Sequence, residues 1–130
     1  MRNMLNGDML ETAAFFERSP GALPLYEAFA EKVCAAFPDV NIKIQKTQIT
    51  FTARYGFAFI SLPRSKKIGP AGSVVISLGL PREVRSPRIF AAVEPYPGRW
   101  THHLLLQSPE EIDPELMMWV KEAYDFAQIK

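Results

Sequence analysis

The chain is poor in the residue types that most often carry chemistry. Its 130 residues include one cysteine, Cys34, and two histidines, the neighbours His102 and His103. A single cysteine excludes an internal disulfide and a cysteine-based metal cage. We therefore expect no metal site and no cofactor, and the sequence names no catalytic residue. A reducing cytoplasm is the simplest location for such a chain.

Long apolar runs and nucleotide-binding motifs are also missing. No run is long enough to cross a membrane, so we expect no membrane partner. The N-terminal stretch holds Asp8 and Glu11 and no unbroken apolar segment, which argues against a secretory signal. The sequence has no glycine-rich phosphate loop, nucleophile elbow or His-Glu-x-x-His motif. These absences disfavour the enzyme classes that such motifs identify.

The composition is that of a single globular domain. Hydrophobic residues make up 48% and charged residues 22% of the chain, which are ordinary values, and the length suits one domain spanning residues 1–130. The first forty residues have helical periodicity and are broken at Ser19–Gly21. The second helix carries an apolar stripe at helical spacing. Its members are Leu25, Tyr26, Phe29, Val33 and Phe37.

From Ile42 the apolar period changes to two, which indicates strands. The first strand, within residues 41–53, changes parity near Lys46 and is expected to bend or bulge there. Pro97-Gly98 fits the central positions of a type II turn between the last two strands. Short links between consecutive strands favour an antiparallel meander.

A last helix is predicted after the strands, with Asp113 as its cap and Pro114 at its first position. Its expected buried stripe is Leu116, Trp119, Val120, Ala123 and Ala127. The predicted fold class is therefore α+β. We expect an antiparallel meander of about five strands, covered by two N-terminal helices and one C-terminal helix.

Four runs of residues carry a family resemblance. They are "LPLYEAFAEKV", "IQKTQITFTARYGFAFISLP", "VVISLGL" and "WTHHLLLQSPEEIDPELMMWVKEAYDFA". The matching features within them are Lys46-Thr47, Phe51, Phe57-Ala58, Trp100, the Ser108-to-Asp113 segment and Ala123-Tyr124. Over most of its length beyond about residue 15, the chain resembles small bacterial proteins catalogued as domain of unknown function number 5655. The family brings no known activity, so the resemblance implies no catalytic residue.

The adjacent histidines are predicted to be structural. Neighbours in a strand point to opposite faces, so His102 and His103 cannot converge on one metal or substrate. A two-residue turn places Val93 opposite His102 and His103 diagonal to Glu94. On this register His102 lies at the rim of the core, and His103 is near enough to Glu94 to pair with it.

Other reactive side chains also favour structural roles. Cys34 lies beside Val33 on a helix, where a buried, inert thiol is expected. An acidic cluster lies at the start of the last helix, where the helix dipole favours negative charge. Its members are Glu110, Glu111, Asp113 and Glu115.

Basic residues are concentrated in the middle of the chain. Residues 41–100 carry ten basic and two acidic residues, whereas both ends are acidic. In a meander, one group of arginines lies near the acids of the last helix and is expected to pair with them; it comprises Arg54, Arg82, Arg85 and Arg88. The opposite end forms the predicted anion-binding site. Its residues are Lys43, Arg64, Lys66, Lys67, Arg99 and Trp100. A solvated basic loop is the alternative interpretation.

Three functions remain open from the sequence. The favoured one is a non-enzymatic binding or protein-interaction module, and the alternative is a nucleic-acid or phosphate-ligand binder using the basic sheet edge. An enzyme of unknown reaction is third, because no nucleophile–base pair is evident. Strand residues of both parities are apolar, among them Phe57, Phe59 and Phe90. They predict an exposed apolar patch and a homodimer.

Overall fold

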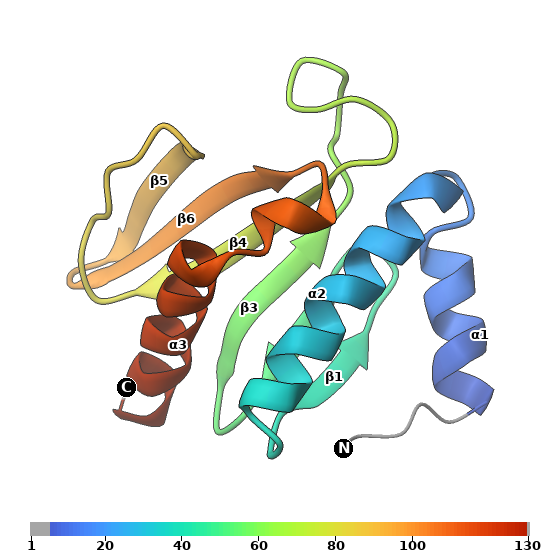
Figure 1. Cartoon of the computed structure of the whole chain (residues 1–130). Coiled ribbons are helices and arrows are strands. Elements are labelled where there is room, and N and C mark those ends of the chain that lie inside the picture. Colours follow the sequence, from blue (N-terminus) through green and yellow to red (C-terminus); the bar gives the residue numbers. More distant parts are fainter. Residues whose placement is uncertain (1–5, 130) are drawn as a thin grey trace.

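The protein folds as one antiparallel sheet with its helices packed against one face (Figure 1). This computed structural model describes residues 6–129, with side chains from residue 10 onward. Residues 1–5, part of the stretch predicted to hold no secretory signal, lie outside the described residues. The predicted α+β class is confirmed, with six strands instead of five. Among the described residues, no helix has the length and apolar character needed to cross a membrane.

The helices lie where the sequence predicts them. They are α1 (Asn6–Phe15), α2 (Leu23–Ala36) and α3 (Pro114–Ile129), with short 3₁₀ turns η1 (Pro20–Ala22) and η2 (Pro109–Glu111). The Leu116 backbone N–H donates to Asp113 Oδ1 at 2.9 Å, which confirms the predicted cap of α3. The predicted stripe of α3 is buried throughout. Each large side chain buried in this way contributes roughly 1.5–3 kcal/mol.

The six strands pair antiparallel. In chain order they are β1 (Asn41–Ile44), β2 (Ile49–Thr52), β3 (Gly56–Ser61), β4 (Val74–Leu80), β5 (Ile89–Tyr96) and β6 (Arg99–Leu106). Their order across the sheet is β1-β2-β3-β4-β6-β5. The meander therefore holds through β4, and β6 then lies between β4 and β5.

The additional strand comes from the parity change near Lys46. Ile44 and Ile49 lie opposite each other, and the Gln45 N–H donates to the Gln48 carbonyl at 2.9 Å. The chain therefore reverses in a tight turn at this point, where a bend or bulge within one strand was predicted. Both isoleucines face the helices, because residues opposite each other on paired strands point to the same face. The apparent change of alternation in the sequence is therefore the turn between two strands.

The segment between β4 and β5 crosses the sheet from one end to the other. β4 ends at Leu80, opposite Trp100, while β5 begins at Ile89, opposite Leu104 and close to the other end of β6. Halfway along, Val84 is buried, and its N–H donates to His102 Nε2 at 2.8 Å. The crossing therefore runs over the face that carries His102, and it lets β6 lie beside β4.

The sheet has a helix-covered face and an open face. On the helix-covered face, Phe29 of α2 meets Phe51 with ring centroids 5.6 Å apart, and α3 packs over β3 and β4 (Figure 1). A register shift between β2 and β3 brings Phe57 onto this same face, where its ring contacts Tyr124 at 5.4 Å. The open face, opposite α2 and α3, therefore carries Phe59 without Phe57, and less apolar surface than the sequence predicts.

Candidate functional site

The open face carries a hollow of about 560 Å³, which we call the sheet hollow. Its floor includes residues from β3, β4 and β6, and its walls come from the 62–73 loop, the β1–β2 turn and the start of β5. The lining residues are Arg18, Thr47, Gln48, Ser61, Leu62, Arg64, Ile68, Val75, Ser77, Phe90 and His103. The volume falls within the range of small-molecule sites in proteins.

A hydrogen-bonded pair lies on the floor of the sheet hollow. Ser77 and His103 are register partners on β4 and β6, and Ser77 Oγ lies 2.6 Å from His103 Nδ1. This contact fixes the imidazole ring, and its Nε2 has no partner among the described residues. Burial lowers the pKa of His103, so the ring is neutral at neutral pH. A neutral imidazole there offers one further polar contact to a ligand.

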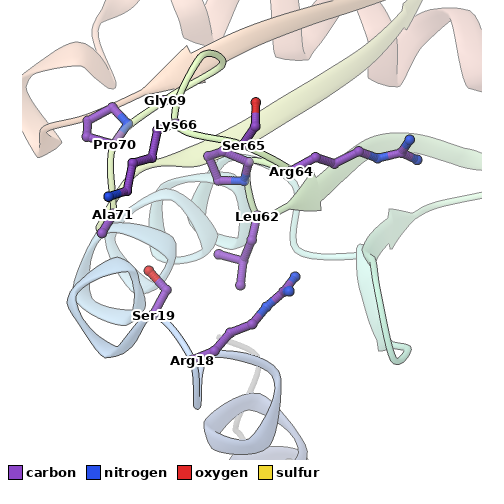
Figure 2. A pocket seen from close by; sticks show the side chains of 10 residues that line it. Arg18, Ser19, Leu62, Arg64, Ser65, Lys66, Gly69, Pro70 and Ala71 are labelled. Atoms are coloured by element: carbon purple, nitrogen blue, oxygen red, sulfur yellow. The ribbon is translucent and has the colours of Figure 1, made fainter.

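Two guanidinium groups line the wall. Arg18 precedes η1 and Arg64 lies in the 62–73 loop, and no carboxylate within residues 10–129 forms an ion pair with either. Both residues also line a smaller pocket of about 240 Å³, the loop pocket. In Figure 2 their side chains extend to the same side of Leu62, whereas Lys66 extends toward Ala71. Arg18 and Arg64 thus bring positive charge to both the hollow and the loop pocket.

Glycines hold the 62–73 loop against the sheet. At Gly69 an added Cβ would lie 2.6 Å from Leu105 Cδ1, so glycine allows this close approach over the open face without displacing that side chain. Gly72 has a φ of 93°, which favours glycine, and its N–H donates to Ser19 Oγ at 3.2 Å. This bond ties the loop to the segment that carries Arg18. The local fold therefore places the two arginines beside one site.

A β-bulge places an aromatic ring at the far side of the hollow. Ile89 pairs with Leu104 and Ala91 with His103, which leaves Phe90 as the extra residue. The Phe90 side chain is 48% exposed, and its ring centroid lies 6.1 Å from that of His103, with planes 30° apart. Bulges commonly redirect a side chain beside a functional site.

Comparison with protein families decides the classification. The model described as Domain of unknown function (DUF5655) matches residues 11–127. The chain belongs to this family. The resemblance seen in the sequence is thereby confirmed. The description names no activity, and no curated protein or solved structure matches the chain.

Several features that identify this DUF5655 domain surround the core and the hollow. Lys46-Thr47 forms the β1–β2 turn, and Thr47 lines the sheet hollow. Phe51 and Phe57 are buried under α2 and α3. Tyr124 stacks on Phe37 with centroids 4.3 Å apart. The family pattern is therefore mainly one of packing, with one element beside the candidate site.

The predicted anion-binding residues are divided between different parts of the DUF5655 domain. Arg64 and Lys66 line the loop pocket, and Lys67 is exposed in the same loop. Lys43 is exposed on β1, opposite Thr50. Arg99 and Trp100 lie elsewhere, because Trp100 pairs with Leu80 whereas the 62–73 loop joins β4 at Val74. The crossing between β4 and β5, which the sequence does not reveal, causes this separation.

Two of the four arginines in the other predicted group, Arg82 and Arg88, pair with acids at or in α3 as predicted, whereas Arg54 and Arg85 have other partners. Arg88 donates to both carboxyl oxygens of Asp113, to Glu115 and to the Glu111 carbonyl, at 2.7–3.1 Å. Arg82 donates twice to Glu122, which raises the arginine's pKa. Arg85 pairs with Glu83 at 3.3 Å, and Arg54 donates to the Gln128 carbonyl. Arg82 and Arg88 therefore connect the segment between β4 and β5 to α3.

The acidic cluster has the structural role that was predicted. Glu111 Oε1 accepts from the backbone N–H groups of Gln107 and Ser108 at 2.6 and 3.1 Å. The Leu116 N–H and then Arg88 lower the pKa of Asp113. No group of three or more potential metal ligands was found in the part of the chain that the structure describes. Cys34 is half-buried on α2.

The two histidines lie on opposite faces, and their predicted partners need correction. A register shift between Val93 and Tyr96 places Ala92 opposite His102 and Ala91 opposite His103. Glu94 accepts from the Gly98 N–H at 3.0 Å, and His103 bonds Ser77 instead. His102 is fully buried in the core, whereas the sequence predicts a position at its rim. Pro95, which has no N–H to donate, lies within the shifted stretch.

The sequence does not identify Arg18 and Ser77 as residues of the site. Arg18 lies among the first forty residues, which carry more acidic than basic residues, so the net charge of that segment does not reveal a basic site residue. Ser77 is a polar interruption of an apolar strand, which is a detectable signal. Its pairing with His103 depends on β6 lying beside β4, and no sequence pattern here predicts that order.

Proposed function

We propose that this DUF5655 domain is a non-enzymatic module that binds a small phosphate-bearing ligand in the sheet hollow. The observation that carries the proposal is two guanidinium groups, those of Arg18 and Arg64, which have no ion-pair partner within residues 10–129 and line a hollow floored by Ser77 and His103. Guanidinium forks match phosphate oxygens in bidentate geometry. Thr47 and Ser61 add hydroxyl groups to the same lining.

A small ligand is favoured over a long nucleic acid. A polyanion needs a track of cations along the surface. Arg99 and Trp100 lie at the far end of β6 from the 62–73 loop, so the six residues predicted from the sequence do not gather at one edge. The cations that do gather surround a hollow of about 560 Å³, the size of a small-molecule site.

Binding is also favoured over hydrolysis by a Ser77–His103 pair. Acyl transfer needs backbone N–H donors beside the nucleophile to stabilise an oxyanion. Ser77 lies in the middle of β4, which pairs with β3 at Phe59 and with β6 at His103, so its neighbours' N–H groups belong to the ladder. In addition, no carboxylate within residues 10–129 bonds His103, so the base has no orienting acid.

A titration with ribose 5-phosphate, followed through the His103 imidazole proton signals by NMR, tests the proposal. We expect a saturable shift of the His103 signal, with that of His102 unchanged because it lies on the other face. The variants Arg18→Ala and Arg64→Ala should each weaken binding about tenfold or more, since a charge-assisted hydrogen bond contributes roughly 1.5–3 kcal/mol. Arg85→Ala, which removes an exposed arginine outside the hollow, should leave it unchanged. Absence of a saturable shift at millimolar ligand would refute the proposal.

A second candidate function is self-association through β5. This strand is an edge of the sheet, and Val93 and Tyr96 on it are 51% and 64% exposed. Unpaired edges with exposed apolar side chains favour strand addition by another chain. Light scattering at micromolar concentration should give twice the monomer mass, and Val93→Glu should return it to that of the monomer. A monomer mass for the unaltered protein would remove this candidate.

A further inference from the structure

We infer that the phosphate-bearing ligand also carries a planar aromatic ring, as a nucleoside monophosphate does, and that the ring stacks at Phe90 while the phosphate meets Arg18 and Arg64. This inference rests on the proposed function, because it assumes that the sheet hollow binds a phosphate. It adds the chemical class of the rest of the ligand. The juxtaposition that carries it is an exposed aromatic ring and two guanidinium groups on the same hollow.

The width of the hollow exceeds what a phosphate ion can fill. Its lining includes Ser61 on β3, Ser77 on β4, His103 on β6 and Phe90 on β5. These are four neighbouring strands, and a spacing of about 4.8 Å between neighbours gives a floor about 14 Å wide. A phosphate held at the arginines would leave the β5 side empty. The extra length suits a ligand with a second group at some distance from its phosphate.

The chemistry of the β5 side identifies that second group. The rings of Phe90 and His103 lie within 30° of parallel, with centroids 6.1 Å apart, and both line the hollow. The Ser77 hydroxyl fixes the His103 ring, and the bulge brings Phe90 beside it. A planar base gains roughly 1–3 kcal/mol by stacking on such a ring. Nearly half of the Phe90 side chain is exposed, which a ligand ring would cover.

The polar groups between the two ends fit a sugar. Ser61 on β3 and Ser77 on β4 carry hydroxyl groups on the strands that lie between the β1–β2 turn and the β5 edge, and Thr47 and Gln48 of that turn add a hydroxyl and an amide to the lining. The Gln48 amide donates to the Thr50 hydroxyl at 3.1 Å, which leaves the amide oxygen available as an acceptor. A ribose presents hydroxyl donors and acceptors at the centre of a nucleotide. A ligand with its phosphate at Arg18 and Arg64 and its base at Phe90 would thus place its sugar over the hydroxyl groups of the floor.

Calorimetric titration of the full chain with adenosine 5′-monophosphate, ribose 5-phosphate and adenosine tests the inference. We expect the monophosphate to bind about fivefold or more tightly than ribose 5-phosphate, because stacking adds roughly 1–3 kcal/mol. Phe90→Ala should abolish that difference and leave ribose 5-phosphate binding unchanged. Phe90→Trp should retain it, since a larger ring still stacks. Tyr96→Ala, which removes an exposed aromatic on the same strand outside the hollow, is the matched control.

The outcomes distinguish the inference about the ligand's ring from the proposed binding of a phosphate. Equal binding of the monophosphate and ribose 5-phosphate, both weakened by Arg64→Ala, would overturn the inference and leave the proposed function standing. Binding of neither compound would overturn both. Tighter binding of a short single-stranded oligonucleotide than of the monophosphate would overturn the small-ligand class. Circular dichroism of the Phe90 variants shows whether the fold is kept, and Phe90→Trp keeps the test decisive if Phe90→Ala unfolds.

Discussion

Arginine and histidine side chains lie on both faces of the sheet, but their surroundings differ between the two faces. On the helix-covered face, arginines are paired with acids and His102 is enclosed in the core; Arg88, for example, meets Asp113, Glu115 and a backbone carbonyl. On the open face, Arg64 and Arg18 line a hollow without an ion-pair partner among residues 10–129, and His103 bonds only a serine hydroxyl. Folding thus engages the paired arginines and the Nε2 of His102 on the first face, and it leaves part of the second set for a ligand.

The adjacent histidines show that neighbouring residues of one strand can have these two different surroundings. His102 accepts the N–H of Val84, so it stabilises the crossing between β4 and β5. His103 takes part in no such connection, and its Nε2 is available in the hollow. The alternation of side chains along β6 is therefore the cause of the difference. Each prediction below alters one face and leaves the other intact.

The largest effect is expected at His102. The change His102→Ala leaves a cavity in the core and removes the acceptor of a buried N–H, and it should lower the free energy of unfolding by about 3 kcal/mol. His103→Ala, one residue along, should lower it by about 1 kcal/mol or less, since its site is open on one side. Urea denaturation of both variants measures the difference. Equal losses would show that both faces support the fold to the same degree.

A similar contrast is expected between two arginines. Arg88→Ala removes four hydrogen bonds, three of them partly buried, and should cost about 1–2 kcal/mol of stability. It should leave ribose 5-phosphate binding unchanged. Arg64→Ala should change stability by less than about 0.5 kcal/mol and weaken binding. Denaturation and titration of both proteins test this, and a stability loss in Arg64→Ala equal to that in Arg88→Ala would contradict it.

The helix-covered face was predictable from the sequence because burial leaves a periodic pattern. The stripes of α2 and α3 follow helical spacing, and Asp113 with Pro114 marks the start of α3 by local chemistry. The turn at Pro97-Gly98 was also predictable from these two residues. Gly98 has a φ of 75°, as the second central position of a type II turn requires. These features depend on residues close together in the chain, whose constraints are visible in a single sequence.

The open face was not predictable, because its site depends on contacts between distant segments. Ser77 and His103 meet only because β6 lies beside β4, and Arg18 reaches the hollow through a bond between Ser19 and Gly72. Register shifts also move side chains without a clear signal in the sequence, as with Phe57 and Phe90. Among the predicted anion-binding residues, only Arg64 lines the sheet hollow.

A smaller effect is expected from adding a methyl group to the open face. In Gly69→Ala the new Cβ meets Leu105 Cδ1 and Ser73 Oγ, at 2.6 and 2.7 Å, so these side chains or the 62–73 loop must shift. Because Ser73 is buried and its hydroxyl donates to the Pro70 carbonyl, we expect the loop to move. We expect a stability loss of about 1 kcal/mol and weaker phosphate binding, because Arg64 moves with the loop. Gly79→Ala is the control, since no atom lies within 4 Å of its Cβ. Unchanged binding in Gly69→Ala would show that the loop does not position Arg64.

The smallest effect concerns pH, and its sign follows from the histidines. Burial lowers the pKa of both His102 and His103 below the ordinary value of 6.5. The unfolded chain therefore takes up protons first as the pH falls, so stability is highest above about pH 6.5 and declines below it until the folded-state pKa is passed. His103→Gln should make this decline shallower without removing it, because His102 still titrates.

A ligand separates the two contributions to this decline. A phosphate in the sheet hollow favours the charged form of His103 and raises its pKa, so ribose 5-phosphate should protect the protein most strongly at acidic pH. Thermal unfolding between about pH 8 and pH 5, with and without the compound, measures the protection. The pH dependence of the protection should become weaker in His103→Gln, while the decline due to His102 persists because that ring is buried beneath the crossing segment. Protection with the same pH dependence in both proteins would place the phosphate too far from His103 to change the charge of that ring.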